Sequence, residues 1–301
     1  MNIQHILVPL DFSEFSDKAL DFALTLAEKF QSEITLFHAV VLFQDDVGEE
    51  QRLQEYEEWI KRREHHIHHQ MHNSQQKAES RGLTVNSVIN RGVNAADVIL
   101  EYLEEHPSEL VIMGTHGRTG LKHLLLGSVA EKVVRLSPIP VMTIHRSLQK
   151  FQISKILTPI DFSIYSKTAA DDAIMLASQL GASLQFIHVI QHDIHPSFYA
   201  AGIDSIFQID KGLKKRVIIN LKEFLSDQLP PDLQAEYAVR EGKAHKEIVD
   251  YAKDAKTDLI VIATHGLTGL DYILLGSTAE KVVRSANCPV LTVKKVNTGK
   301  Y

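Results

Sequence analysis

The chain repeats one sequence pattern twice, and this repeat limits the folds that it can adopt. Residues 5–40 match residues 155–190 at 13 of 36 positions, and residues 110–135 match residues 259–284 at 17 of 26. Both blocks occur in the same order, and the offset between the copies falls from 150 to 149 residues between them. Such a pattern indicates a duplicated domain rather than a short solenoid repeat. We therefore expect two homologous domains in the 301 residues, at positions 1–147 and 152–301.

Each copy alternates strand-like and helix-like segments. Residues 3–10 are rich in leucine and β-branched residues, which is typical of a buried strand. Apolar residues then recur with helical spacing up to Phe30, and Ser13 is a candidate N-cap. A long polar helix is predicted at 49–81, ended by Gly82. Strands with helices between them predict a parallel α/β sheet with right-handed connections. Further strands are predicted at 33–42, 83–90, 110–113 and 141–145, and further helices at 95–105 and 122–136.

The composition excludes several classes of protein. With 38 acidic against 32 basic residues and a net charge of -6, the chain has no surplus of cations for nucleic-acid binding. Its single cysteine, Cys288, excludes an intramolecular disulfide and a cysteine-based zinc site. The start of the sequence does not have the pattern of a signal peptide, and the apolar runs are far shorter than the ~20 residues that span a bilayer. We expect a soluble, cytoplasmic protein without a membrane partner.

Two features lie at the predicted carboxyl ends of strands, where open α/β sheets bind ligands. One is the acid that closes the first strand, Asp11 and its counterpart Asp161. The other is the glycine-rich stretch 114–120, which continues to 127–129 beside a helix. Glycines let backbone N–H groups approach an anion, and a helix N-terminus attracts negative charge. Neither a Walker lysine motif nor a dinucleotide fingerprint is present. From the glycines alone, a phosphate cradle and a tight strand-to-helix loop both remain open.

The spacing Gly114-x2-Gly117-x9-Gly127-Ser128 resembles the ATP-binding signature of the universal stress protein family. The opening strand with its end at 8–13 and the His38-Ala39-Val40 stretch also resemble that family. The resemblance covers both halves. It implies a five-stranded sheet of order 3-2-1-4-5 in each domain, of the adenine-nucleotide alpha-hydrolase-like kind. It further implies ATP bound between strands one and four, and a nucleotide-dependent regulatory role in the stress response.

The resemblance also implies which residues bind the nucleotide. Asp11 would contact the adenosine, the backbone at Val40 or Val41 would bind the adenine edge, and the glycine loop and helix start would hold ribose and phosphates. In the second half the first glycine of the signature is Ala263, whose methyl group would crowd the ribose, or would be strained if its φ is positive. The cofactor-binding residues predicted in this way are Pro9, Leu10, Asp11, Val40, Val41, Gly114, His116, Gly117, Gly127, Ser128 and Val129, then Pro159, Ile160, Asp161, Val189, Ile190, Ala263, His265, Gly266, Gly276, Ser277 and Thr278.

The loop histidines leave the question of catalysis open. His116 and His265 could act as general bases near neutral pH, or could bond or stack near the ribose. Neither half has a paired acid, a lysine clamp or a set of carboxylates for Mg²⁺ beyond one aspartate. We therefore expect a nucleotide-binding module without catalytic residues, with Mg²⁺ entering only alongside ATP. The alternative is a slow ATP hydrolase or phosphotransferase on the same fold.

A histidine cluster occupies one part of the long helix. His65, His69 and His72 fall at i, i+4 and i+7 on one face, a spacing at which imidazoles can bind zinc or nickel. The corresponding stretch of the second half has no histidine, so the cluster is not a property of the repeat. It is either a solvated helix face or the metal-responsive surface of an interaction protein.

The last strand of each half is predicted at a sheet edge. These strands, at 141–145 and 291–294, would offer unpaired backbone groups in an isolated domain, and such edges invite pairing. Members of the family that the chain resembles dimerise through this strand. The resemblance therefore implies a pseudo-dimer of the two halves within one chain, and a homo-oligomer of chains.

Overall fold

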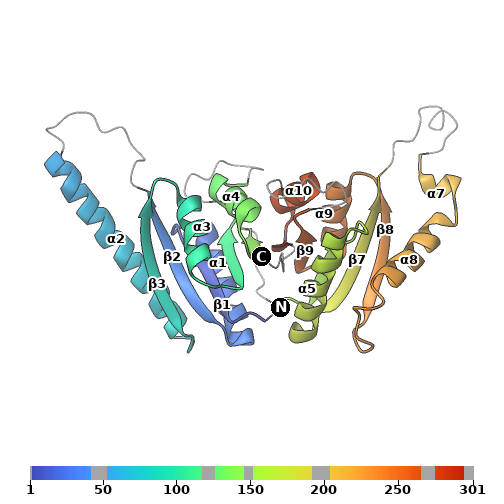
Figure 1. The fold of residues 1–301 in the computed structure, drawn as a ribbon, viewed down its shortest axis with the longest axis horizontal. Helices are drawn as coiled ribbons and strands as arrows, with labels where there is room; N and C mark the ends of the chain where they lie inside the picture. Colours follow the sequence, from blue (N-terminus) through green and yellow to red (C-terminus); the bar gives the residue numbers. More distant parts are fainter. Residues whose placement is uncertain are drawn as a thin grey trace, which may run out of the picture. The chain divides into compact units, whose positions relative to one another are not determined.

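The computed structural model describes residues 2–41, 53–116, 126–145, 152–191, 204–265 and 275–294. The chain divides into two compact units, which we call the N-terminal unit and the C-terminal unit. Each is an α/β unit (Figure 1). The N-terminal unit holds β1 (His5–Pro9), α1 (Glu14–Phe30), β2 (Glu33–Val41), α2 (Leu53–Glu79), β3 (Val85–Gly92), α3 (Ala95–Glu105), β4 (Leu110–Gly114), α4 (Ser128–Leu136) and β5 (Val141–Ile144).

The C-terminal unit repeats this order, with α7 and α8 in the place of α2. Its elements are β6 (Lys155–Pro159), α5 (Ile164–Leu180), β7 (Ser183–Ile190), α7 (Ile206–Ile209), α8 (Leu213–Phe224), β8 (Ala235–Glu241), α9 (Ala244–Asp254), β9 (Leu259–Ala263), α10 (Ser277–Ser285) and β10 (Val290–Val293). Among the described residues no helix is long and apolar enough to cross a membrane.

Both sheets have the same parallel topology. In the N-terminal unit the strand order is β3-β2-β1-β4-β5, and in the C-terminal unit it is β8-β7-β6-β9-β10. All strand pairs within each unit are parallel, for example Ile6 beside Ile34 and Ile156 beside Leu184. Two helices contact each face, and right-handed connections of parallel strands require this arrangement. The predicted fold class and the order 3-2-1-4-5 are therefore confirmed.

The core lies between the sheet and its helices, and the central strands supply most of it. Leu7 and Val8 of β1 and Phe37 of β2 are fully buried, as are Leu157 and Phe186 in the C-terminal unit. Continuous apolar strands of this kind are required where helices cover both faces of a parallel sheet. This packing fixes the carboxyl ends of β1 and β4, which is where the candidate site lies.

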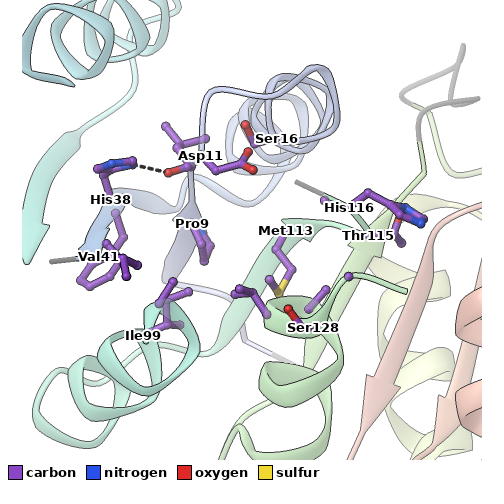
Figure 2. A pocket seen from close by; sticks show the side chains of 18 residues that line it. Pro9, Asp11, Ser16, His38, Val41, Ile99, Met113, Thr115, His116 and Ser128 are labelled. Atoms are coloured by element: carbon purple, nitrogen blue, oxygen red, sulfur yellow. Dashed lines mark hydrogen bonds between the residues drawn. The ribbon is translucent and has the colours of Figure 1, made fainter. Parts of the chain in front are cut away.

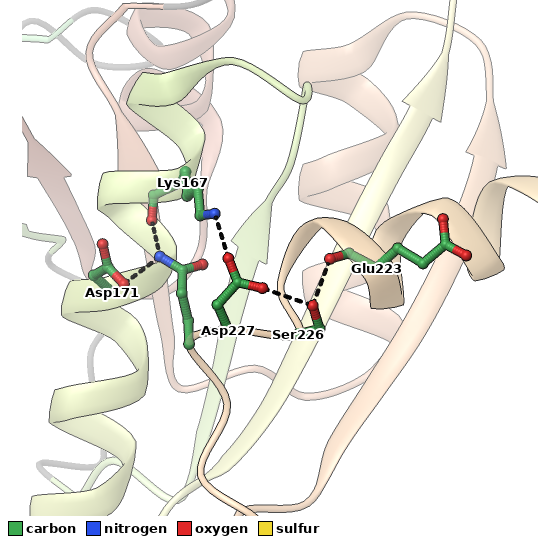
Figure 3. A network of polar contacts seen from close by, with 6 residues as sticks. Lys167, Asp171, Glu223, Ser226 and Asp227 are labelled. Atoms are coloured by element: carbon green, nitrogen blue, oxygen red, sulfur yellow. Dashed lines mark hydrogen bonds and ion pairs between the residues drawn. The ribbon is translucent and has the colours of Figure 1, made fainter.

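In each unit a polar contact joins the first helix, α1 or α5, to α2 or to the segment just after α8. The lysine belongs to α2 in the N-terminal unit but to α5 in the C-terminal unit. Lys77 of α2 pairs with Asp21 of α1 at 2.6 Å. In the C-terminal unit Lys167 of α5 instead contacts Asp227 after α8, with 3.4 Å between Nζ and Oδ2 (Figure 3). Gln228 donates to the Lys167 carbonyl at 3.3 Å and to the Asp171 carboxylate. Both units therefore have a polar contact at this place, with the positions of lysine and aspartate exchanged.

Serine caps begin the first helix of both units, as predicted for Ser13. The Ser13 Oγ accepts a hydrogen bond from the Ser16 N–H at 3.3 Å and donates one to the Asp11 carboxylate at 2.6 Å. Ser163 accepts the corresponding bond from Ser166 at 3.1 Å. The cap therefore joins the start of the helix to the acid that closes the strand.

Replacing Ser13 by alanine removes both bonds, and we expect it to lower the free energy of unfolding by about 1 kcal/mol. Ser13→Thr keeps a hydroxyl and is expected to cost roughly half as much or less. Urea unfolding of the two variants and the native chain measures the difference. Equal losses from alanine and threonine would show that the hydroxyl contributes nothing.

Several element boundaries differ from the sequence prediction. The helix predicted from Lys122 begins at Ser128, because Gly127 has extended backbone angles and is the N-cap; residues 117–125 lie outside the described part. The strand predicted at 83–90 lies at 85–92 instead. Gly82 follows α2 with φ +76°, as its predicted role requires.

The one-residue difference between the halves is located after β3. Val40 pairs with Arg91 and Ile190 pairs with Glu241, so the offset is still 150 at the end of these strands. The next helices begin at Ala95 and Ala244, where the offset is 149. The exposed residue Val93, just before the N-cap of α3, therefore has no counterpart in the C-terminal unit.

Candidate functional site

Each unit has a cavity at the carboxyl ends of its central strands. The N-terminal pocket has a volume of about 330 Å³ and lies beyond β1 and β4, between the end of β2 and the start of α4 (Figure 2). Its position follows from the topology, because the connections from β1 and β4 leave the sheet toward opposite faces there. It is lined by Pro9, Leu10, Asp11, Ser16, Phe37, His38, Ala39, Val41, Ala95, Ile99, Met113, Gly114, Thr115, His116, Gly127, Ser128, Val129 and Ala130.

The C-terminal pocket repeats this construction with a volume of about 350 Å³. Most of its lining residues are the counterparts of those in the N-terminal pocket. Gln191 replaces Val41, and Thr278 replaces Val129. It is lined by Pro159, Ile160, Asp161, Ser166, Ile187, His188, Val189, Gln191, Ala244, Ile248, Ile262, Ala263, Thr264, His265, Gly276, Ser277, Thr278 and Ala279.

The structure brings most of the predicted site residues together. Val40 and Ile190 do not line the pockets, and Val40 is only 8% exposed. Gly117 and Gly266 lie outside the described residues. The predicted residues that line the pockets are Pro9, Leu10, Asp11, Val41, Gly114, His116, Gly127, Ser128 and Val129, and in the C-terminal unit Pro159, Ile160, Asp161, Val189, Ala263, His265, Gly276, Ser277 and Thr278.

A strained corner positions the aspartate of each pocket. Phe12 has φ 59° and Phe162 has φ 65°, in the left-handed region that aromatic residues rarely adopt. The Asp11 Oδ1 accepts hydrogen bonds from the N–H and the hydroxyl of Ser13, at 3.0 and 2.6 Å. Asp161 accepts the corresponding N–H bond from Ser163 at 3.0 Å. The corner therefore fixes the carboxylate at the edge of the cavity.

A histidine on the second strand closes the same corner, a role that the sequence analysis missed. The Nδ1 of His38 lies 2.6 Å from the Leu10 carbonyl, and the ring stacks on Phe12 with centroids 4.7 Å apart (Figure 2). His188 contacts the Ile160 carbonyl at 2.7 Å in the same way. Because a carbonyl only accepts, Nδ1 carries the proton in both rings. The repetition of this histidine in both halves is the signal that could have revealed it.

A threonine after β4 connects the glycine-rich stretch to the last strand. The N–H of Thr115 donates to the Ile144 carbonyl at 3.1 Å, and its own carbonyl accepts from the Gly127 N–H at 2.8 Å. The Nδ1 of His116 lies 3.0 Å from the Thr115 hydroxyl, and its ring lies against Phe15. Thr264 makes the same contacts with its own neighbours. His116 and His265 are therefore held at the rim by local contacts.

The start of α4 faces the N-terminal pocket with backbone donors. Gly127 is the N-cap and supplies no side-chain bond to the helix, and Ser128, Val129 and Ala130 line the cavity. The first N–H groups of a helix have no partner within it, and they attract anions. Gly276 caps α10 in the same way. The described lining of each pocket contains one carboxylate and no lysine or arginine, so the helix start is the main electropositive feature there.

The substitution of Ala263 for the first glycine introduces no backbone strain. Neither position has a positive φ, so alanine is not strained there. A Cβ added at Gly114 would lie 2.8 Å from the Phe15 Cβ and 2.9 Å from the Phe15 carbonyl carbon. A methyl at the Gly114 position is therefore directed at the first helix, whereas the crowding of a ribose by the Ala263 methyl stays a prediction.

The histidine cluster of α2 gives no support to a metal centre. His65, His69 and His72 are exposed, whereas Ile67 and Met71 between them are buried against the sheet. The His69 Nδ1 lies 3.2 Å from the Asn73 amide nitrogen. Within the described ranges no three His, Cys, Asp or Glu side chains are placed to hold a metal ion. The zinc or nickel site predicted from the helical spacing is therefore unsupported, because the spacing aligns these side chains without converging them.

Known proteins resemble this chain over one half or over its whole length. The profile of the universal stress protein family matches residues 2–145 and again residues 152–294. A universal stress protein of Methanocaldococcus jannaschii is 38% identical over 141 residues, which cover 47% of this chain and 82% of that protein. The universal stress protein E homolog of Haemophilus influenzae is 25% identical over 319 residues, covering 98% of each chain.

A solved structure shows the same fold over almost all of the chain. A universal stress protein from Archaeoglobus fulgidus matches with a TM-score of 0.71 at 22% identity, covering 98% of this chain and 100% of that one. The family profile matches each unit separately, and each unit has the same strand order. This chain is therefore a member of the universal stress protein family, with the family's domain present twice.

Proposed function

We propose that each unit binds an adenine nucleotide, with ATP as the principal ligand, and that occupancy of the pockets makes the chain a nucleotide-dependent regulatory module of the stress response. The observation that carries this proposal is the uncapped helix start that faces each cavity beside a fixed aspartate. Backbone N–H groups bind the phosphates, which accounts for pockets whose described lining has no basic side chain.

The remaining lining suits a nucleoside. Apolar side chains of Val41, Ile99 and Met113 line the pocket, where a base can bury its faces. The Asp11 carboxylate also lines the pocket, and as an acceptor it would bind the hydroxyl groups of the ribose. One carboxylate in each described lining is fewer than a protein cage for Mg²⁺ needs, so the ion would enter bound to the triphosphate.

A charge placed at the helix start tests the proposal. Ser128 and Ser277 are exposed first residues of α4 and α10. We expect Ser128→Asp to weaken ATP binding at the N-terminal pocket by about tenfold or more, because the carboxylate repels phosphate. An acid in the first turn also stabilises a helix, so the fold is retained. Ser128→Asn has the same shape without the charge and is the matched control.

Isothermal titration calorimetry with ATP measures the result. The native chain is expected to bind two nucleotides, Ser128→Asp or Ser277→Asp one with native affinity, and the double aspartate variant none at that affinity. No binding of ATP, ADP or AMP to the native chain would overturn the proposal. Phosphate release that requires the protein and is lost in the aspartate variants would show an enzyme instead of a binding module.

A further inference from the structure

The second pair of helices lacks an ion pair that joins the first pair. In the N-terminal unit Lys132 of α4 contacts Asp97 of α3, with 2.6 Å between Nζ and Oδ1. With the offset of 149 that holds from α3 onward, the counterparts are Lys281 of α10 and Lys246 of α9. Two ammonium groups therefore occupy the positions of an attractive pair, and like charges at such positions repel.

A third lysine stands at the beginning of α9. The N-cap of α3 is Asn94, whose side chain accepts from the Ala96 N–H at 2.9 Å, whereas the N-cap of α9 is Lys243, which makes no such bond. Lys243, Lys246 and Lys281 are all exposed, and none has an acidic partner in the described part of the chain. We call these three residues the lysine cluster.

Within the described ranges the acids nearest in sequence form no ion pair with the cluster. Glu280 of α10 contacts Arg284 at 2.8 Å, and Glu247 of α9 lies against Gly242. The two helices pack against each other, as α3 and α4 do. His245 lies among the cluster: burial lowers the pKa of its imidazole, and Lys281 and Lys243 lower it further. Two ammonium groups from different helices therefore act on one imidazole.

The cluster adjoins the C-terminal pocket where α9 and α10 begin. Ala244, next to Lys243, and Thr278 of α10 both line that pocket. In the N-terminal unit a recess of about 220 Å³ lies at the counterpart positions and shares Ser128 and Val129 with the pocket. The recess is lined by Asn94, Ser128, Val129, Glu131, Lys132 and Arg135.

We propose that Lys243, Lys246 and Lys281 form an anion subsite that takes the terminal phosphates of a nucleotide in the C-terminal pocket. This inference rests on the proposed function. An anion between the lysines would remove their repulsion, and phosphate groups beyond the α-phosphate extend from the helix start toward them. The C-terminal pocket therefore selects nucleoside triphosphates over monophosphates more strongly than the N-terminal pocket, where Asp97 already neutralises Lys132.

The N-terminal unit supplies the matched variant. Lys243→Asn with Lys246→Asp gives α9 the residues of α3, and Lys214→Asn with Lys215→Asp makes the same charge change on the exposed start of α8. ATP and AMP are titrated into the parent chain and both variants. All three also carry Ala39→Trp, whose side chain fills the N-terminal pocket. We expect the ratio of ATP to AMP affinity to fall about tenfold or more in the α9 variant and less than about twofold in the α8 variant.

A second measurement does not require the Ala39→Trp substitution that fills the N-terminal pocket. Inorganic tripolyphosphate is titrated into the α9 and α8 variants without Ala39→Trp, and we expect only the α9 variant to lose affinity. An unchanged ATP to AMP ratio in the α9 variant would overturn the subsite while the proposed function stands. If neither pocket bound any nucleotide, the proposed function would fail. Loss of tripolyphosphate binding confined to the α9 variant would then still support the subsite, and equal binding by both variants would overturn it.

Discussion

Replacing Gly114 by alanine is expected to lower the free energy of unfolding of the N-terminal unit by about 2–3 kcal/mol. The added Cβ would lie 2.8 Å from the Phe15 Cβ and 3.0 Å from the Phe15 carbonyl oxygen. Because two of the three nearest atoms are backbone atoms of α1, no side-chain rotation relieves the contact. The helix must move away from β4, and its first turn carries the Ser13 cap that holds Asp11.

The C-terminal unit provides the control for this variant. Its β9 already ends in Ala263, so Ala263→Gly adds no contact and is expected to cost roughly 1 kcal/mol or less, from backbone entropy. Hydrogen exchange followed by mass spectrometry separates peptides of β4 from peptides of β9 and reports each unit by itself. Equal, small losses of protection in the two variants would show that α1 adjusts to the methyl at no cost.

Alkylation of Cys288 at pH 8 is expected to be about a thousandfold slower in the folded chain than in the chain denatured by urea. Burial, together with the nearby Asp258 carboxylate, raises the pKa of its thiol from 9.0 to about 12. Only the thiolate reacts, and its fraction at pH 8 falls by about that factor between the two pKa values. Cys288 is the single cysteine of the sequence, so one label reports one site.

The measurement is the rate of mass increase with iodoacetamide, with and without urea. Between pH 7 and pH 9 the folded rate should rise about tenfold for each pH unit, since both values lie well below the folded pKa. Asp258→Asn is expected to increase the folded rate, because it removes a negative charge that opposes ionisation. Similar rates for the folded and denatured chains would contradict the raised pKa of the thiol in the folded chain.

The sequence predicted the fold well because the signals for it are local and occur twice. The α3 helix has its predicted bounds, Ala95–Glu105, and Ser13 has the predicted capping role. Alternation of apolar strands with amphipathic helices leaves few topologies once right-handed connections are required. The predicted start of a helix was wrong where a glycine is the N-cap, as at Gly127. The helical periodicity of the sequence continues through the residues before the true start.

The candidate site was predicted in position but only partly in its construction. Glycine spacing indicated the stretch after β4, because positions where the backbone approaches a ligand closely favour glycine. The left-handed conformation of Phe12 could not be predicted, because that backbone region is expected for glycine or asparagine. The role of His38 depends on its contact with the Leu10 carbonyl, 28 residues away. Contacts of this kind follow from strand register, which the pattern of one strand does not contain.

The unmatched residue Val93 divides the chain into exchangeable segments. The paired strands before it have counterparts 150 residues away, and the described helices and strands after it have counterparts 149 residues away. A hybrid gene spliced at this loop would join β1–β3 of one unit to the α9–β10 part of the other without changing the length of any strand or helix. Such hybrids would combine the aspartate corner of one pocket with the phosphate-binding helix start of the other, so the contributions of these two parts of the site could be measured separately.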